Sequence, residues 1–566
     1  MNGKKIVFAV FIFLVSTSAH AQLGFDAFHY TISKKVICSR GAVVSAHPLA
    51  SKAGVAMLKK GGNAFDAAIA TQLALAVVYP QAGNLGGGGF LVGRIPSGKN
   101  ISIDYREKAP SGASRDMYLD ANGNPQMKLS QDGHLSSGVP GTIAGLFATH
   151  KYAKLPFKTL IQPAIELAEK GFVITAREAQ SMNSIQNRLK ENNTVACVFL
   201  KPAGWKAGDT LVQPELARTL KRIRDGGAKG FYEGETAQLI IDEMKRGKGI
   251  LSLQDLKNYQ AVERKATQFN YRGYEIVTMP LPSSGGIIIE QCLKIMASHR
   301  LNTMGFQSAQ AVQLMVEAER RAFADRAEYM GDPDFVKVPA KTLVSDAYLA
   351  DRMKDFVPGQ AGNSQLVKAG KMPHESEETT HLAVVDEKGN AVAVTTTLNN
   401  SYGSATVVGG AGFFMNDEMD DFSVKPGVPN MYGALGTEAN AIAPGKRMLS
   451  SMTPTLVLKN NRPFLVAGTP GGTTIPTSVF QTIVNVIDFN LSTEDAVNKP
   501  KFHHQWLPEE IMVEKDFPAE TRAALEKMGY KIVNRGAIGR SELIRVDGKK
   551  IEAVGDNRGD DSAEGY

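Results

Sequence analysis

One stretch decides the fold: residues 379–399, which read TTHLAVVDEKGNAVAVTTTLN. Two apolar runs flank a polar segment that contains Gly, and this pattern predicts a β-hairpin with strands over residues 380–386 and 391–397. Residues 359–378, directly before it, are rich in Gly, Ser, Lys, His and Glu and show no apolar period, which predicts a mobile linker. Thr379 therefore stands at the junction between a polar linker and a buried strand.

On the N-terminal side of this junction the pattern is mainly helical. Apolar residues recur at helical spacing over residues 46–60 and 63–78, which predicts a helical hairpin capped by Asn63. A β-hairpin is predicted over residues 90–105, so that Arg106 lies at a strand end. Further helices are predicted over residues 159–170, 216–224, 236–246 and 309–329, with a strand-like segment at 274–279.

On the C-terminal side the pattern continues with a hairpin over residues 455–468 and an amphipathic helix over 473–489. Gly471 and Gly472 directly precede that helix. Helices mixed with hairpins in this way predict antiparallel sheets covered by helices on both faces.

The chain begins as an exported protein would. Lys4 and Lys5 precede a short apolar run and the small residues that end at Ala21, which predicts a signal peptide over residues 1–21. No later apolar run has membrane-spanning length, so no membrane anchor is expected. A periplasmic location fits best, and the signal peptide alone leaves secretion to the medium open.

Composition narrows the function classes. A hydrophobic content of 43% is ordinary for a globular protein, and a formal net charge of +7 over 566 residues is weak. Because no dense basic stripe with interleaved aromatics occurs, nucleic-acid binding is not expected. The three cysteines, Cys38, Cys197 and Cys292, are widely separated and allow at most one disulfide.

The usual catalytic motifs are missing. The sequence contains no G-x-S-x-G, Walker A, H-E-x-x-H or C-x-x-C motif. The His503-His504 pair lacks further ligands at metal-binding spacing, so we interpret it as part of a polar loop rather than a metal site. No metal and no cofactor is expected.

A Thr-Thr pair at a strand edge is by itself ordinary, since β-branched residues favour strands. Its context is specific. The distinctive segments are Thr379-Thr380-His381, Thr397-Leu398-Asn399, N-D-E-M-D-D-F-S at 416–423, Leu449-Ser450-Ser451-Met452, Pro470-Gly471-Gly472, Tyr105 to Pro110, Pro140-Gly141-Thr142, and F-H-H-Q-W-L-P at 502–508. In these segments, and in their order along nearly the whole mature chain, the sequence resembles the γ-glutamyltransferase family.

The resemblance implies an α+β fold, the four-layer αββα sandwich of N-terminal-nucleophile hydrolases, with stacked, mainly antiparallel sheets. It also implies a precursor that cuts itself between Glu378 and Thr379. The expected products are a large subunit, residues 22–378, and a small subunit, residues 379–566, which stay together in one αββα unit. Scission gives Thr379 a free α-amine, which is a usable base near its hydroxyl.

The resemblance further implies catalysis by acyl transfer. Thr379 would attack the γ-glutamyl amide of glutathione and related compounds, release Cys-Gly, and pass the acyl group to water, an amino acid or a dipeptide. Backbone N–H groups of Gly471 and Gly472 would stabilise the oxyanion, and the Thr397 hydroxyl would orient the nucleophile. The expected donor-binding residues are Arg106, Asn399, Glu418, Asp421, Ser450, Ser451 and, in a lid loop over residues 425–440, Tyr432.

Small departures from the family pattern occur at Asp417, Met448, Thr469 and Thr473. Two alternatives remain open. A cephalosporin or glutaryl acylase of the same superfamily would share the threonine chemistry without needing an acidic wall of Glu418 and Asp421. A non-catalytic periplasmic protein that binds γ-glutamyl peptides would remain a single uncut chain.

Overall fold

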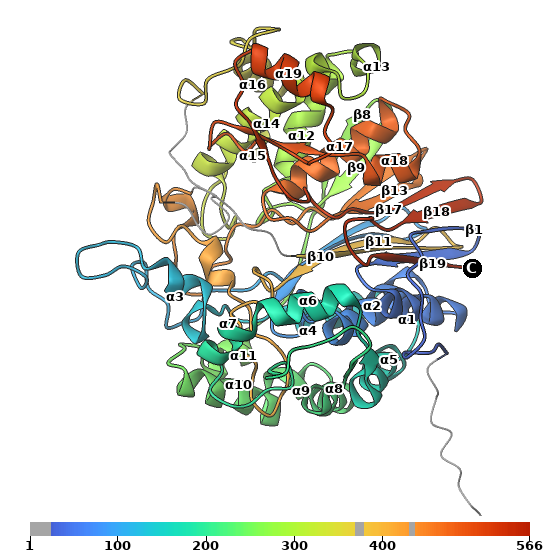
Figure 1. Cartoon of the computed structure of the whole chain (residues 1–566), viewed down its shortest axis with the longest axis vertical. Helices are drawn as coiled ribbons and strands as arrows, with labels where there is room; N and C mark the ends of the chain where they lie inside the picture. The colour runs from blue at the N-terminus through green and yellow to red at the C-terminus, as the bar shows by residue number, and fades with distance from the viewer. Residues whose placement is uncertain (1–23, 368–378, 429–435) are drawn as a thin grey trace, which may run out of the picture.

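Two stacked sheets of seven strands form the centre of the protein, which is described here by a computed structural model (Figure 1). The structure describes residues 24–367, 379–428 and 436–566. All neighbouring strands in both sheets pair antiparallel. The first sheet has the order β1 (Lys35–Cys38), β18 (Lys550–Val554), β17 (Glu542–Asp547), β13 (Arg462–Gly468), β12 (Thr455–Lys459), β9 (Tyr274–Thr278), β8 (Thr267–Tyr271). The second has the order β19 (Ser562–Gly565), β2 (Gly41–Ser45), β10 (Thr380–Asp386), β11 (Ala391–Thr397), β3 (Gly88–Arg94), β4 (Asn100–Asp104), β7 (Val262–Arg264).

The β10–β11 hairpin lies in the middle of the second sheet, with the bounds that the sequence predicts. Side chains alternate between its two faces, as the period of two in a strand requires. Leu382 and Val384 pack into the core shared with the helices below, whereas Ala383 and Val385 pack into the core between the sheets. All four are buried, which explains why β10 carries apolar side chains on both of its faces.

Helices cover the outer face of the second sheet (Figure 1). The predicted helical hairpin is confirmed, and Asn63 begins its second helix with a capping box that includes Asp66. Apolar residues of both helices of this hairpin form one core with the strands of the second sheet. The principal helices of this layer are α1 (Pro48–Lys59), α2 (Ala64–Val78), α4 (Thr142–His150), α5 (Phe157–Lys170), α6 (Ala176–Ser184), α8 (Pro214–Gly226) and α10 (Gly234–Arg246).

A second helical layer covers the first sheet, so the architecture is αββα, as expected (Figure 1). Its helices share an apolar core with both sheets. They are α12 (Gly285–Ala297), α13 (Leu301–Met304), α14 (Ala309–Tyr329), α15 (Ala340–Leu343), α16 (Asp346–Arg352), α17 (Thr474–Ile487), α18 (Thr493–Asn498) and α19 (Ala519–Lys527).

The described part of the predicted linker, residues 359–367, is irregular but not free in solvent. Ser364 is buried, and its backbone N–H donates to Glu509 over 2.7 Å while its carbonyl accepts from the Trp506 indole over 2.9 Å. These hydrogen bonds anchor Ser364 to the 506–509 segment, while the mobility of the linker stays a prediction. The rest of the linker and the predicted signal peptide lie outside the described residues.

Two further predictions concern membrane-spanning helices and disulfide bonds. Within the three described ranges, no helix combines the length and apolar content needed to cross a bilayer. Cys38, Cys197 and Cys292 are all free thiols.

Candidate active site

A small buried cavity lies where β10 begins and β11 ends. It collects side chains from segments far apart in the sequence, and most of the predicted site residues are among them. Thr379, at its wall, is only 5% exposed. The lining consists of Arg106, Arg326, Thr379, Thr397, Asn399, Glu418, Asp421, Ser450, Ser451, Met452, Gly472, Thr473 and Ile475.

The hairpin register brings the two threonines together. Thr380 pairs with Thr396, so Thr379 and Thr397 follow at the same end of the two strands. The Thr397 hydroxyl oxygen accepts a hydrogen bond from the Asn399 N–H over 2.8 Å. Asn399 has a φ of +78°, and its side-chain amide donates to the Asp417 carbonyl over 3.0 Å. A turn at the end of β11 thus holds Thr397 and Asn399 at the cavity.

Arg106 follows β4 and is almost completely buried. Its guanidinium donates to Glu418 Oε1 and to Asp421 Oδ2, and its Nε donates to the Met448 carbonyl over 3.3 Å. The sequence predicted separate cationic and anionic walls, whereas here the opposite charges contact one another directly. The physical reason is that an unpaired charge in a buried site costs far more than a paired one.

A third carboxyl group, that of Glu107, stands behind this pair. Glu107 is fully buried, and no described residue donates a hydrogen bond to either of its carboxyl oxygens. Its Oε2 lies 3.7 Å from Arg106 Nη1, and its carboxyl group is within hydrogen-bonding reach of the Glu418 carboxyl group. Burial and then the Glu418 charge raise the pKa of Glu107 well above its ordinary value. Burial raises the pKa of Glu418 to about 7, against the opposing effect of Arg106.

Arg326, on α14, was missed by the sequence analysis. Its Nη2 donates to the Ser451 hydroxyl over 3.4 Å, and its Nε donates to the Ser284 hydroxyl over 3.1 Å. Ser284 in turn donates to the Ser450 carbonyl over 2.8 Å. One buried guanidinium therefore positions the segment that carries both predicted serines. No sequence signal singles it out, because it stands in a helix with several other charged residues.

The glycine turn before α17 forms the remaining wall. Gly471 has a φ of +134° and Gly472 a φ of +54°, and a Cβ on Gly471 would stand 2.4 Å from the Thr474 hydroxyl oxygen. Only glycine fits this backbone without strain. Gly472 and Thr473 line the cavity directly in front of the helix N-terminus, whose dipole favours negative charge.

Two predicted site residues, Glu378 and Tyr432, lie outside the described residues. Asp417, one of the departures from the family pattern, is fully buried and accepts a hydrogen bond from the Asn400 N–H over 2.9 Å. Burial raises its pKa well above the ordinary value.

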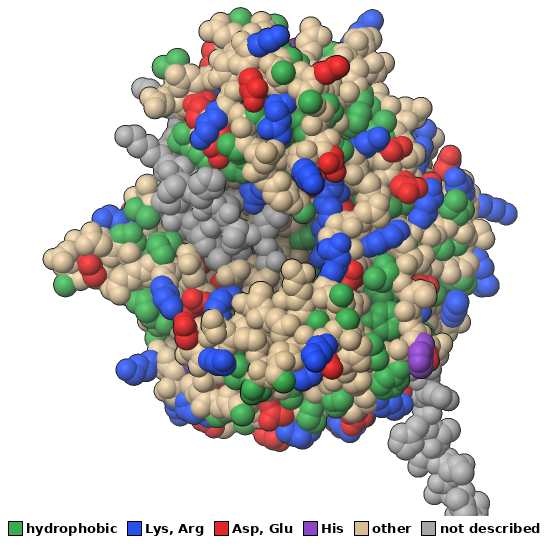
Figure 2. Space-filling model, in the orientation of Figure 1, with side chains coloured by type: hydrophobic (Ala, Val, Ile, Leu, Met, Phe, Trp, Pro, Cys, Tyr) green, Lys and Arg blue, Asp and Glu red, His purple; other side chains and the backbone are tan. Residues whose placement is uncertain are grey.

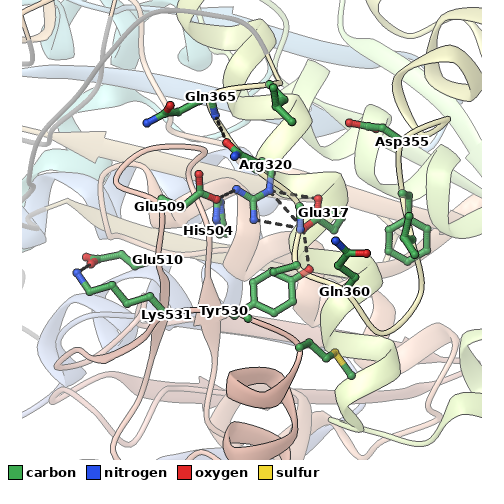
Figure 3. Close-up of a pocket in the computed structure, with 18 residues that line it drawn as sticks. Glu317, Arg320, Asp355, Gln360, Gln365, His504, Glu509, Glu510, Tyr530 and Lys531 are labelled. Carbon is green, nitrogen blue, oxygen red and sulfur yellow. Dashed lines mark hydrogen bonds and ion pairs between the residues drawn. The ribbon is translucent and has the colours of Figure 1, made fainter.

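A larger cavity, of about 800 Å³, opens beside α14 and contains none of the predicted site residues (Figure 3). The charged groups in its wall already neutralise one another, since Arg320 contacts Glu317 and Glu509. His504 lies at its edge. The prediction of a polar loop at His503-His504 is wrong: His503 is buried in the short strand β14 (Phe502–His503), where Thr477 and Gln505 bind its two ring nitrogens.

Comparison with known proteins agrees with this geometry. The family model described as gamma-glutamyltranspeptidase matches residues 50–566. A glutathione hydrolase proenzyme of Escherichia coli strain K12 is 46% identical over 96% of this chain and 93% of its own length. Among solved structures, a cephalosporin acylase from Bacillus halodurans has a TM-score of 0.82 at 27% identity and covers 95% of this chain and 98% of its own. A Helicobacter pylori gamma-glutamyltranspeptidase structure has a TM-score of 0.57 at 43% identity and covers 58% of this chain and 94% of its own.

Proposed function

The chain belongs to the γ-glutamyltranspeptidase family, and on that premise we propose that Thr379 is its nucleophile. The protein is a γ-glutamyltransferase and glutathione hydrolase with the fold of the N-terminal-nucleophile hydrolases. One observation carries the assignment of the site. Thr379 shares a single buried cavity with two guanidinium groups, two carboxyl groups, two serine hydroxyls and a glycine turn.

The precursor cuts itself before Thr379. The Thr379 hydroxyl attacks the carbonyl of Glu378, the peptide bond becomes an ester, and water opens the ester to leave a carboxylate on Glu378 and an α-amine on Thr379. The products are a large subunit, residues 22–378, and a small subunit, residues 379–566. The amine, with a pKa near about 8, then serves as the base that an otherwise weak hydroxyl nucleophile needs.

The donor is recognised by exchange of charge pairs. A γ-glutamyl compound carries an α-carboxylate and an α-ammonium on one carbon. The carboxylate binds the guanidinium of Arg106 and the hydroxyls of Ser450 and Ser451. The ammonium binds Glu418 and Asp421, with Asn399 beside it. Because the internal ion pairs are replaced by two intermolecular ones, no buried charge is left without a partner.

Chemistry then proceeds through an acyl-enzyme. The Thr379 oxygen attacks the γ-carbonyl of glutathione, its proton passes to the α-amine, and the oxyanion is stabilised by N–H groups of the Gly471-Gly472 turn. The proton moves on to the nitrogen of Cys-Gly as the C–N bond breaks. Water or an acceptor amine attacks the resulting ester and restores Thr379. The Thr397 hydroxyl orients the nucleophile.

The acidic wall favours this reaction over that of the related acylases. A glutaryl or cephalosporin side chain has no α-ammonium for Glu418 and Asp421 to bind, so two buried carboxylates would lose their partner if such a substrate took Arg106. We place the mature enzyme in the periplasm on the strength of the predicted signal peptide.

The Thr379→Ala variant tests the proposal. We expect a single uncut chain on a denaturing gel and no release of p-nitroaniline from γ-glutamyl-p-nitroanilide, whereas the unaltered protein gives two fragments and product. A cut or active Thr379→Ala protein would refute the assignment of the nucleophile.

A further inference from the structure

A third cavity, distinct from the catalytic one and from the one beside α14, lies at the far end of β10 from Thr379. It encloses about 440 Å³. The end of β3 and the turns β10–β11, β12–β13 and β17–β18 meet there. Because a strand rises about 3.3 Å per residue, the seven residues of β10 place this cavity roughly 20 Å from the catalytic one. It is therefore a separate site, and nothing in the reaction above uses it.

Arg94 forms the inner wall of this cavity and is only 3% exposed. Its Nη1 donates to Asn100 Oδ1 over 2.5 Å, and its Nη2 donates to the carbonyl oxygen and to the side-chain oxygen of Asn461. All these acceptors are neutral. Among the described residues Arg94 has no ion pair, and Glu275 acts on it only at a distance. Burial lowers the pKa of Arg94 below its ordinary value.

The rim of the cavity adds cations without matching acids. Lys388 and Lys549 come from the β10–β11 and β17–β18 turns, Arg462 is the first residue of β13, and all three are exposed. Lys and Arg side chains are numerous over this end of the sheets, around β1 and β18 (Figure 2).

Among the residues that the structure describes, two acids line the cavity, Asp386 and Glu387, and both have other partners. Asp386 accepts hydrogen bonds from the backbone N–H groups of Ala64, Lys388 and Asn390. Glu387 pairs with Arg40 over 3.2 Å. The cavity as a whole thus has an excess of positive charge, with its most buried member unpaired.

We propose that this cavity binds a small multivalent oxyanion of the phosphate-ester class. A buried guanidinium that lacks a carboxylate is costly, and an oxyanion in the cavity would supply the missing charge. Arg94 can offer such an anion those N–H groups that Asn100 and Asn461 do not already use, while the lysines act as point charges at the rim.

Calorimetric titration with inorganic pyrophosphate at low ionic strength tests the proposal on the full-length, processed protein. We expect saturable binding of one anion per protein and a loss of about tenfold or more in affinity for Arg94→Gln, because a hydrogen bond to a charged group is removed. Arg522→Gln is the matched control, since Arg522 also donates to a neutral side-chain oxygen, that of Asn534, but does not line the cavity. Citrate in place of pyrophosphate separates a phosphate site from a polycarboxylate site.

The proposal would be overturned if the unaltered protein and Arg94→Gln bound pyrophosphate with equal affinity, or if binding did not saturate. Tighter binding of citrate than of pyrophosphate would overturn the ligand class. Unchanged turnover of the γ-glutamyl donor shows that Arg94→Gln is folded. If that variant does not fold, Lys388→Ala combined with Lys549→Ala decides. Both residues lie in exposed turns, and their joint removal should weaken binding several-fold and flatten its salt dependence, whereas an unaltered affinity would refute the site.

Discussion

Replacing Glu418 by Gln isolates the charge that binds the donor ammonium. The side chain is 1% exposed and contacts Arg106, so solvent and salt screen it little. A hydrogen bond to a charged group contributes about 1.5–3 kcal/mol, and since Asp421 still contacts the ammonium, the lower half of this range applies. A loss of about 2 kcal/mol corresponds to a rise of about thirtyfold in the donor KM.

The same substitution changes the pH dependence of donor use. A protonated carboxyl cannot pair with an ammonium, so kcat/KM for the donor should fall as the pH falls through the pKa of Glu418, about 7. The α-amine of Thr379 must also lose its proton to act as the base, so Glu418→Gln should keep an acid limb from that amine. The part of the limb that belongs to Glu418, near pH 7, should vanish while self-cleavage persists. Initial rates with γ-glutamyl-p-nitroanilide between pH 6 and 9 measure both effects, and Glu235→Gln, an exposed partner of Arg222, is the control. An unchanged KM together with an unchanged pH profile would show that Glu418 does not face the ammonium.

Three further variants test neighbouring parts of the structure. Arg106→Lys keeps the charge but loses the fork, so the donor KM should rise about tenfold or more while the gel still shows two fragments; equal damage to both would place Arg106 outside the donor site. Arg326→Met keeps the apolar stem and removes the donors to Ser451 and Ser284, so KM should rise more than kcat falls, and a pure loss of kcat would contradict a positioning role. Asn63→Ala, in the uncut Thr379→Ala background, removes a helix cap and should lower the free energy of unfolding by about 1–2 kcal/mol in a urea titration, with Asn122→Ala in an exposed loop as the control.

Local patterns predicted most of the elements correctly because the relevant signals are short-range. The β10–β11 hairpin has the predicted ends, since its apolar strands and its Gly-containing turn are continuous in sequence. The capped helical hairpin at Asn63 is confirmed for the same reason. His503 shows the limit: its polar side chain indicated a loop, yet two buried partners satisfy it inside a strand.

The site was predicted residue by residue only through the family resemblance, and three-dimensional contacts added what the sequence could not show. Arg106 and Glu418 are far apart along the chain, so their direct pairing depends on the tertiary fold that brings the segment after β4 next to Glu418. Glu107 was not distinguished from a solvated acid, because its raised pKa comes from burial and from the nearby Glu418 charge, both of which depend on the fold. Arg326 was hidden in a charged helix.

The strand order has a consequence for a nicked protein. In the second sheet β2 and β3 precede the junction at Thr379 in sequence, while β19, β10 and β11 follow it, and they alternate in space. The two fragments are therefore interleaved, and separating them means rupturing the central hydrogen-bond ladders. Recovery of the cut enzyme from denaturant becomes a second-order process whose yield depends on protein concentration, whereas the uncut precursor can recover as a single chain at any dilution.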